Sequence, residues 1–271
     1  GEVLLTGSAT AALEISMLLV GVQPGDEVIL PAFTFVSTAT AVMMQGATPV
    51  FADIDPITLG LDPGSVASKI TAKTRAIIPV HYAGVGCAMA PLLELAKTHG
   101  LTIVEDAAHG IGADIAGQAL GRIAPLGVLS FHESKNVGCG EGGALIVNDP
   151  DLVHRAHVLR DKGTNRAAFL TGSVDKYTWQ DLGASFGLSE LPAAYLLGQL
   201  EHLDHVTARR RDIWHRYASA LGSMRHAGHL TWSDPPRGHM HNGHIFYGLL
   251  PTPDARTAFI AHLAQNGVQA F

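Results

Sequence analysis

One lysine of this sequence, Lys135, stands where a lysine could do covalent chemistry. It lies in a loop between the apolar runs 125–131 and 144–147, and the glycine-rich stretch 138–143 follows it. The loop is too rich in glycine for a helix and too polar for a core. In a narrow, partly dry site the pKa of a lysine falls, and the neutral amine can form a Schiff base with an aldehyde cofactor. A lone lysine in a turn is more often a solvated surface residue, so the prediction depends on its partners.

Residues elsewhere in the chain could serve such a cofactor. Asp106 follows the apolar segment 101–104, and a carboxylate at a strand's end can pair with a protonated ring nitrogen, which improves the electron sink. By itself, such an aspartate is more often an ordinary loop residue. Ser130 could donate a hydrogen bond to a phosphate, and the ring of Phe33 or Phe35 could stack on a flat cofactor.

The first residues of the chain predict a phosphate-binding turn. The apolar run 3–5 is followed by the small residues 6–10 and by an alanine- and leucine-rich helix to Val20, with Ser8 or Thr10 as its N-cap. A helix N-terminus presents free backbone N–H groups and a positive dipole end, which suits a phosphate. An ordinary N-cap is the commoner explanation of such a turn taken alone.

The elements that must position these residues alternate along the chain. The pattern predicts strands at 27–30, 48–52, 75–80, 101–105, 111–113, 126–131 and 144–147, and helices at 36–45, 65–71, 90–100 and 149–161. This alternation predicts an α/β fold with a mostly parallel central sheet and helices on both faces. Ligands of such sheets bind at the carboxyl ends of strands, where the sequence places Phe33, Phe35, His81, Tyr82, Asp106 and His109.

We expect three parts in the chain. Residues 1–185 form a large cofactor-binding domain, 186–222 a long connecting helix, and 223–271 the beginning of a small C-terminal α/β domain. Within the last part, 244–250 is typical of a strand and 255–265 of a helix. The sequence starts without a methionine and ends on a strand-like segment, so we expect a fragment that lacks both ends.

Composition narrows the class of protein. Hydrophobic residues make up 47% and charged residues 15% of the chain, as in a globular protein with broad buried sheets. A net charge of −6 without a basic block argues against a nucleic-acid surface. No apolar run approaches the roughly 20 residues that span a bilayer, and no signal-peptide pattern is visible. Two cysteines, Cys87 and Cys139, are too few for a disulfide framework, so we expect a reducing compartment, the cytoplasm.

Five motifs occur in one order over nearly the whole chain. They are Gly-Ser-Ala-Thr-Ala-Ala-Leu at 7–13, Pro-Ala-Phe-Thr-Phe-Val-Ser-Thr-Ala at 31–39, Pro-Val-His-Tyr-Ala-Gly at 79–84, Glu-Asp-Ala-Ala-His at 105–109 and Ser-Phe-His-Glu-Ser-Lys-Asn at 130–136. Together they resemble the sugar aminotransferases of the DegT/DnrJ/EryC1/StrS family. The resemblance implies the aspartate aminotransferase-like fold, fold type I of the enzymes that use pyridoxal 5′-phosphate (PLP). It also implies a homodimer with shared active sites and PLP bound at its interface.

Carried over position by position, the resemblance assigns roles to residues of this chain. It makes Lys135 the Schiff-base lysine, which also moves a proton as general acid–base, and Asp106 the partner of the pyridine nitrogen. The other cofactor contacts fall on Phe35 over the ring, His109 at the ring edge, Ser8, Ala9 and Ser130 at the phosphate, and Ser185 from the partner subunit. Substrate contacts are expected from His81, Tyr82, Asn136, Lys176 and Tyr177.

A narrower resemblance concerns the substrate. The segments 162–166, 175–179 and 193–196 resemble the transaminases that make dTDP-4-amino-4,6-dideoxygalactose for enterobacterial common antigen. Those enzymes move an amino group from L-glutamate to the C4 keto group of dTDP-4-keto-6-deoxyglucose. The turn 183–187 reads Gly-Ala-Ser-Phe-Gly where the family commonly has Gly-Tyr-Asn-Tyr-Arg, so Ser185 stands in for the asparagine. The nucleotide, UDP or GDP in place of dTDP, and the ring position, C3 or C4, stay open.

Other classes of protein are open alternatives. A PLP-dependent sugar dehydratase resembles these transaminases but has histidine where Lys135 stands, and a binding-only homologue or inactive fragment is the non-enzyme alternative. A dehydrogenase is disfavoured, because residues 84–86 lack the third glycine of a dinucleotide fingerprint. His239, His241 and His244 have no cysteine or carboxylate at a metal-binding spacing, so we expect no metal.

Overall fold

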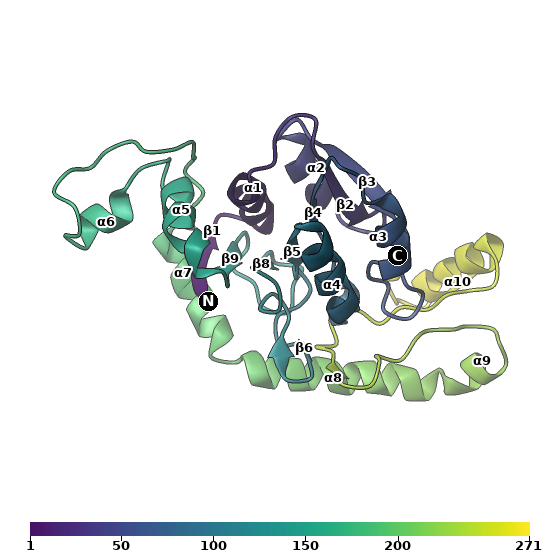
Figure 1. Cartoon of the computed structure of the whole chain (residues 1–271). Helices are drawn as coiled ribbons and strands as arrows, with labels where there is room; N and C mark the ends of the chain where they lie inside the picture. The colour runs from purple at the N-terminus through teal and green to yellow at the C-terminus, as the bar shows by residue number, and fades with distance from the viewer.

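The computed structural model describes all of residues 1–271 and contains a seven-stranded sheet with helices against both faces (Figure 1). Only β9 runs antiparallel to its neighbours, and every other pair is parallel, which confirms the predicted α/β class. All strands except β9 therefore end at one edge of the sheet. The strand order is β1 (Glu2–Thr6), β9 (Gly143–Val147), β8 (Leu126–Ser130), β5 (Thr102–Asp106), β4 (Thr74–Ile77), β2 (Glu27–Pro31) and β3 (Thr48–Ala52).

Local sequence accounts for the boundaries of the covering helices. Ser8 caps the first helix by accepting a hydrogen bond from the Ala11 N–H, and Gly21 ends it in the left-handed conformation with φ 74°. Asp62 and Asp149 cap two others, each followed by a proline that suits the first helical turn. The covering helices are α1 (Ala9–Val20), α2 (Val36–Met43), α3 (Pro63–Lys69), α4 (Met89–His99) and α5 (Pro150–Arg160).

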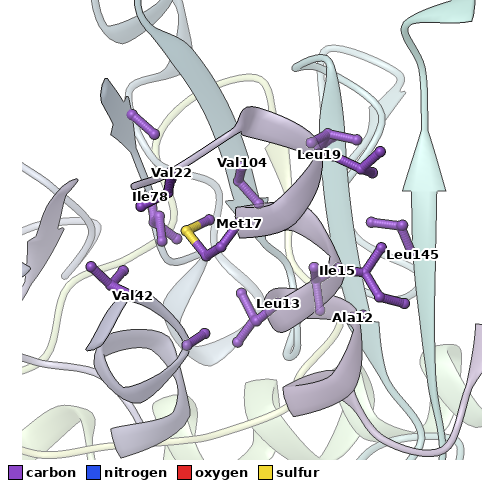
Figure 2. Close-up of a cluster of buried hydrophobic side chains, with 14 of the residues drawn as sticks. Ala12, Leu13, Ile15, Met17, Leu19, Val22, Val42, Ile78, Val104 and Leu145 are labelled. Carbon is purple, nitrogen blue, oxygen red and sulfur yellow. The ribbon is translucent and has the colours of Figure 1, made fainter. Parts of the chain in front are cut away.

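Two hydrophobic cores form because successive side chains of a strand point to opposite faces of the sheet. In β2, Val28 and Leu30 enter the larger core, under α1, α2 and α5, whereas Ile29 enters the smaller core, under α3 and α4. Figure 2 shows the larger core around α1, in which Met17 is fully buried. With both faces covered, the edge formed by the strand ends is the place left for a ligand.

The connecting segment differs from its prediction. The single helix expected over 186–222 is two helices, α7 (Glu190–Leu200) and α8 (Leu203–Ala220), with a turn at 201–202. The turn lets α7 bury Leu196 beside the lysine loop while α8 buries Trp214 in a separate aromatic cluster. In Figure 1 the segment that carries α6 (Arg166–Leu170) projects away from the sheet at the left, and α8 runs along the bottom of the view. None of the helices combines the length and apolar character that a membrane crossing requires.

The strands expected at 244–250 and 111–113 do not form. Phe246 instead packs its ring against Trp214 and Trp232, with centroids 5.4 Å and 5.3 Å away.

Strand β10 (His239–Met240) joins a small sheet with β6 (Asp114–Ile115) and β7 (Gln118–Ala119), so the C-terminal part adds a strand to the first part. The remaining helices are the 3₁₀ turn η1 (Tyr82–Gly84), α9 (Gly222–His226) and α10 (Pro253–Gln265). The division into three domains stays a prediction.

Candidate active site

The ends of the parallel strands border a cavity of about 340 Å³, a volume typical of small-molecule sites. The predicted residues that line it are Ser8, Ala9, Phe35, Tyr82, Asp106, His109, Ser130 and Lys135. It also has polar lining residues that sequence reasoning did not assign to the site, namely Thr10, Thr34, Ser37, Thr38, His132, Ser134 and Glu141. Parallel pairing explains the convergence, because these side chains follow strands that end at one edge.

The turn between β1 and α1 forms an anion-binding wall. Ser8 Oγ accepts a hydrogen bond from the Ala11 N–H at 3.1 Å, which leaves the hydroxyl proton free to donate. A side chain at Gly143 would overlap the backbone of Ser8 and Ala9, so glycine there lets β9 press against the turn. The N-terminus of α1 has no acidic residue in its first turn. Its free N–H groups and positive dipole end suit a phosphate.

Asp106 is buried at the end of β5, with 4% of its surface exposed. Its Oδ2 accepts a hydrogen bond from Thr38 Oγ1 at 2.8 Å, and its Oδ1 accepts one from the Ala108 N–H at 3.1 Å. Burial raises the pKa of Asp106, while these two hydrogen bonds and the charge of Lys135 act in the opposite direction. A buried carboxylate held at both oxygens is suited to pair with a cation in the cavity.

Lys135 lines the same cavity from the loop after β8. Burial lowers the pKa of its amine, and the nearby Asp106 partly opposes that shift. Backbone hydrogen bonds hold the loop, since the Lys135 N–H donates to the His132 carbonyl at 2.9 Å. More of the amine is therefore neutral and nucleophilic near neutral pH than in a solvated lysine.

The rings of Phe35, Tyr82 and His109 line the cavity, and Phe33 lies outside its lining. The Phe33 and Tyr82 ring centroids lie 4.4 Å apart, and those of Tyr82 and His109 lie 5.5 Å apart. Phe35, the residue before α2, keeps 75% of its surface exposed and lines the cavity. Its ring is available to stack on a flat ligand.

Two neutral imidazoles pack against each other beside this site, with the His109 and His244 ring centroids 4.3 Å apart and the ring planes tilted by 41°. Burial, followed by the charges of His244 and Lys135, lowers the pKa of His109 to about 3. Burial, followed by Lys135 and Arg210, lowers the pKa of His244 to about 4. Because His109 Nδ1 accepts a hydrogen bond from the Ala83 N–H at 3.3 Å, its single ring proton is on Nε2.

Two asparagines tie His244 to the lysine loop. Asn136 Nδ2 donates to the Asn242 carbonyl at 3.1 Å, which turns Asn136 Oδ1 towards His244 Nδ1 at 2.7 Å. A carboxamide oxygen only accepts, so His244 Nδ1 carries the proton. Asn242 Nδ2 donates to the His109 carbonyl at 2.7 Å. The C-terminal segment thus contacts the residue that follows the lysine, which sequence reasoning did not foresee.

The sequence model of the DegT/DnrJ/EryC1/StrS aminotransferase family matches residues 1–271. The chain belongs to this family. It is 42% identical over 206 residues to a pleiotropic regulatory protein of Geobacillus stearothermophilus, covering 76% of this chain and 53% of that protein. It is 38% identical over 238 residues to the spore coat polysaccharide biosynthesis protein SpsC of Bacillus subtilis, covering 82% of this chain and 61% of SpsC. The chain therefore spans between half and two thirds of the length of these relatives.

Solved structures share the fold. TlmJ of Streptoalloteichus hindustanus has a TM-score of 0.90 at 32% identity, over 99% of this chain and 71% of TlmJ. NtdA of Bacillus subtilis, solved with the bound cofactor PMP, the amino form of PLP, has a TM-score of 0.88 at 29% identity, over 99% of this chain and 59% of NtdA. The predicted fold type I is confirmed, and PLP is the cofactor of the family.

The cavity of this chain fits PLP in each part of its donor set. The N-terminus of α1 with Ser8 provides an anion site for a phosphate. Asp106 provides a buried carboxylate for a protonated ring nitrogen, and Phe35 an exposed ring for stacking. Lys135 provides an amine with a lowered pKa for an aldehyde. Phosphate, aromatic ring and aldehyde thus each find a matching group around one cavity.

Two predicted substrate contacts do not reach the cavity. His81 is fully buried, its Nε2 bonded to Glu105 Oε2 at 2.9 Å and its Nδ1 accepting from the Cys87 N–H at 3.0 Å. We discard the substrate role of His81, because both ring nitrogens are already bonded and no atom is exposed. Asn136 is 7% exposed, with its amide bonded to the C-terminal segment. We discard its substrate role as well, because both ends of its amide are bonded within the chain and little of its surface is exposed.

Three other predicted residues lie outside the cavity. Lys176 and Tyr177 belong to the projecting segment around α6, where the Tyr177 ring lies 6.2 Å from that of Phe169. Ser185 is exposed, and its backbone forms an isolated antiparallel β-bridge with Asp161. The substrate roles of Lys176 and Tyr177, and the partner-subunit role of Ser185, stay predictions.

Proposed function

We propose that this aminotransferase moves the amino group of L-glutamate to the C4 keto group of dTDP-4-keto-6-deoxy-D-glucose, giving dTDP-4-amino-4,6-dideoxy-D-galactose. The observation that carries transamination is the single cavity that brings together Lys135, buried Asp106 and the N-terminus of α1. A sugar substrate is supported by the name of the relative SpsC, a polysaccharide biosynthesis protein. We propose cell-surface polysaccharide synthesis, of the enterobacterial common antigen type, as the pathway.

Bound PLP would supply an electron sink next to the carbon that gains or loses the amino group. Ser8, Ser130 and the N–H groups of α1 would hold its phosphate. Asp106 would keep a proton on its ring nitrogen, and Phe35 would cover one face of the ring. Lys135 Nζ would take a proton from the substrate carbon that bears the amino group and, as general acid, deliver it to the carbon of the cofactor's aldehyde group.

The alternatives differ in the residues they require. A UDP- or GDP-linked keto sugar, or amination at C3, would use the same cofactor residues, so only the substrate pocket distinguishes them. A sugar dehydratase would have histidine in place of Lys135. A binding-only homologue is disfavoured, because the amine and carboxylate that chemistry requires both line the cavity.

We also propose a homodimer with shared active sites in the cytoplasm. Large apolar side chains are exposed at the cavity and on α7, where Leu191 is 85% exposed and Tyr195 63%. Large exposed apolar side chains of this kind are typical of an interface between subunits. Ser185 stands just before α7 and would enter the partner's phosphate site. The cytoplasm is supported by the two free cysteines, Cys87 and Cys139.

The proposal is tested with purified protein, PLP, L-glutamate and a panel of dTDP-, UDP- and GDP-linked keto sugars. We expect 2-oxoglutarate and an aminated dTDP-sugar, with its mass and the position of the amino group read by mass spectrometry and NMR. Preferential amination of a GDP- or UDP-sugar would reject the dTDP substrate. A folded protein that binds no PLP would reject the aminotransferase function itself.

A further inference from the structure

Thr38 makes a buried hydrogen bond to Asp106, and none of the cofactor contacts proposed above involves Thr38. Thr38 is fully buried on the first turn of α2, and its Oγ1 donates to Asp106 Oδ2 at 2.8 Å. The Thr34 hydroxyl lies 2.8 Å from the same Thr38 oxygen. Since the only hydroxyl proton of Thr38 is used on Asp106, Thr34 must be the donor of this second bond. The two threonines form a directed chain that ends on the carboxylate.

The position of Thr38 makes this chain rigid. Thr34 and Thr38 are four residues apart around the start of α2, so their hydroxyls meet on one side of the helix. A β-branched side chain in a helix has few χ1 rotamers, and burial restricts them further. Thr38 and Asp106 are 68 positions apart in the chain, so the hydrogen bond is a tertiary contact between α2 and the end of β5.

The consequence concerns the orientation and charge of the carboxylate. With Thr38 on Oδ2 and the Ala108 N–H on Oδ1, both oxygens of Asp106 are held and the carboxylate plane is set. Both donors favour the ionised form over the neutral acid, against the effect of burial. We propose that Thr38 is a positioning residue that holds Asp106 ionised and aimed at the ring nitrogen of PLP. This inference rests on the proposed function.

The test compares two ligands on the same protein: PLP and 1-deaza-PLP, in which carbon replaces the ring nitrogen. We define the preference for PLP as the dissociation constant of 1-deaza-PLP divided by that of PLP. This ratio measures the contact between Asp106 and the ring nitrogen, because only PLP has that nitrogen. Thr38→Val removes a hydrogen bond to a charged group. We expect its loss to lower the preference for PLP about tenfold or more. We expect the affinity for 1-deaza-PLP to stay unchanged, and Thr38→Ser to restore the preference.

The matched control is Thr40→Val, which removes an exposed hydroxyl from the same helix. Circular dichroism verifies that each variant is folded, and Thr38→Ser keeps the test informative if Thr38→Val fails to fold. An unchanged preference in Thr38→Val, or an equal loss of affinity for both ligands, would overturn the positioning role. If the unmodified protein bound neither ligand, the proposed function would fall first and this inference with it.

Discussion

At the residue scale, the two groups that matter most are an amine and a carboxylate that perturb each other. Burial lowers the pKa of Lys135 and raises that of Asp106, so burial disfavours the charged form of each. The mutual attraction of the two charges opposes both shifts. The protonated ring nitrogen of bound PLP would give Asp106 a charged partner. Lys135 would then be free to exchange protons. This division of roles leads to separate predictions for the two residues.

We expect Lys135→Ala to lower turnover by about 10²–10⁴, the usual range for loss of a general acid–base. Borohydride should attach PLP covalently to the unmodified protein and not to the variant, as read by intact mass. Lys97→Ala, an exposed change on α4, is the control. Covalent attachment at an unchanged level in Lys135→Ala would assign the Schiff base to another lysine.

We expect Asp106→Asn to lower turnover by orders of magnitude. The protein should still bind PLP, because the turn between β1 and α1 that would hold the phosphate is unchanged. An amide has no charge to keep a proton on the ring nitrogen, so the electron sink is weaker. Stopped-flow kinetics of the glutamate half-reaction give the rate, with the exposed Asp204→Asn of α8 as control. Normal transamination by Asp106→Asn would show that the pyridinium role is wrong.

At the element scale, the decisive contact joins the segment after β10 to the loop after β8. Asn136 and Asn242 connect them, and the His109 ring packs at a tilt against the His244 ring. Both imidazoles are neutral in the folded state because burial disfavours their charged forms. The C-terminal segment therefore contributes to the stability of the loop that carries Lys135.

This contact predicts that the protein loses stability in mild acid. Below the usual histidine pKa of 6.5 the unfolded chain binds protons, whereas folded His244 and His109 bind them only near pH 4 and pH 3. Stability therefore falls as pH drops from 6.5 towards 3. We expect His244→Asn to make the free energy of unfolding, measured in urea, less steeply dependent on pH in this window. The exposed His262→Asn of α10 is the control, and equal slopes in both variants would exclude His244 as a source of the pH dependence.

At the scale of the whole molecule, the apolar surface of α7 bears on assembly. If the proposed dimer uses this surface, Leu191→Glu should shift the protein towards monomer in light scattering, because a charge would be buried in an apolar contact. It should also lower the affinity for PLP, since Ser185 would no longer reach the partner's site. Glu94→Lys on α4, a surface charge change on another helix, is the control. A Leu191→Glu protein that stays dimeric would place the interface elsewhere.

The elements of residues 1–185 were largely predictable because alternation, caps and turns are local properties. Strand β3 and the cap at Ser8 are where the sequence places them. The errors have a common cause in side-chain packing. The turn at 201–202 lets α7 and α8 pack into different clusters, and residues 244–250 pack Phe246 against Trp214 in place of a strand. No local pattern encodes these contacts.

The sequence by itself determined the family, the cofactor and the residues at the strand ends, because these depend on motifs and on the direction of parallel strands. Only the tertiary structure decided which buried groups meet. Thr38 reaches Asp106 across 68 positions and His244 reaches Asn136 across 108, and the same packing seals His81 inside. Such contacts depend on how helices and loops pack onto the sheet, since residues distant in the chain have no local signal for each other.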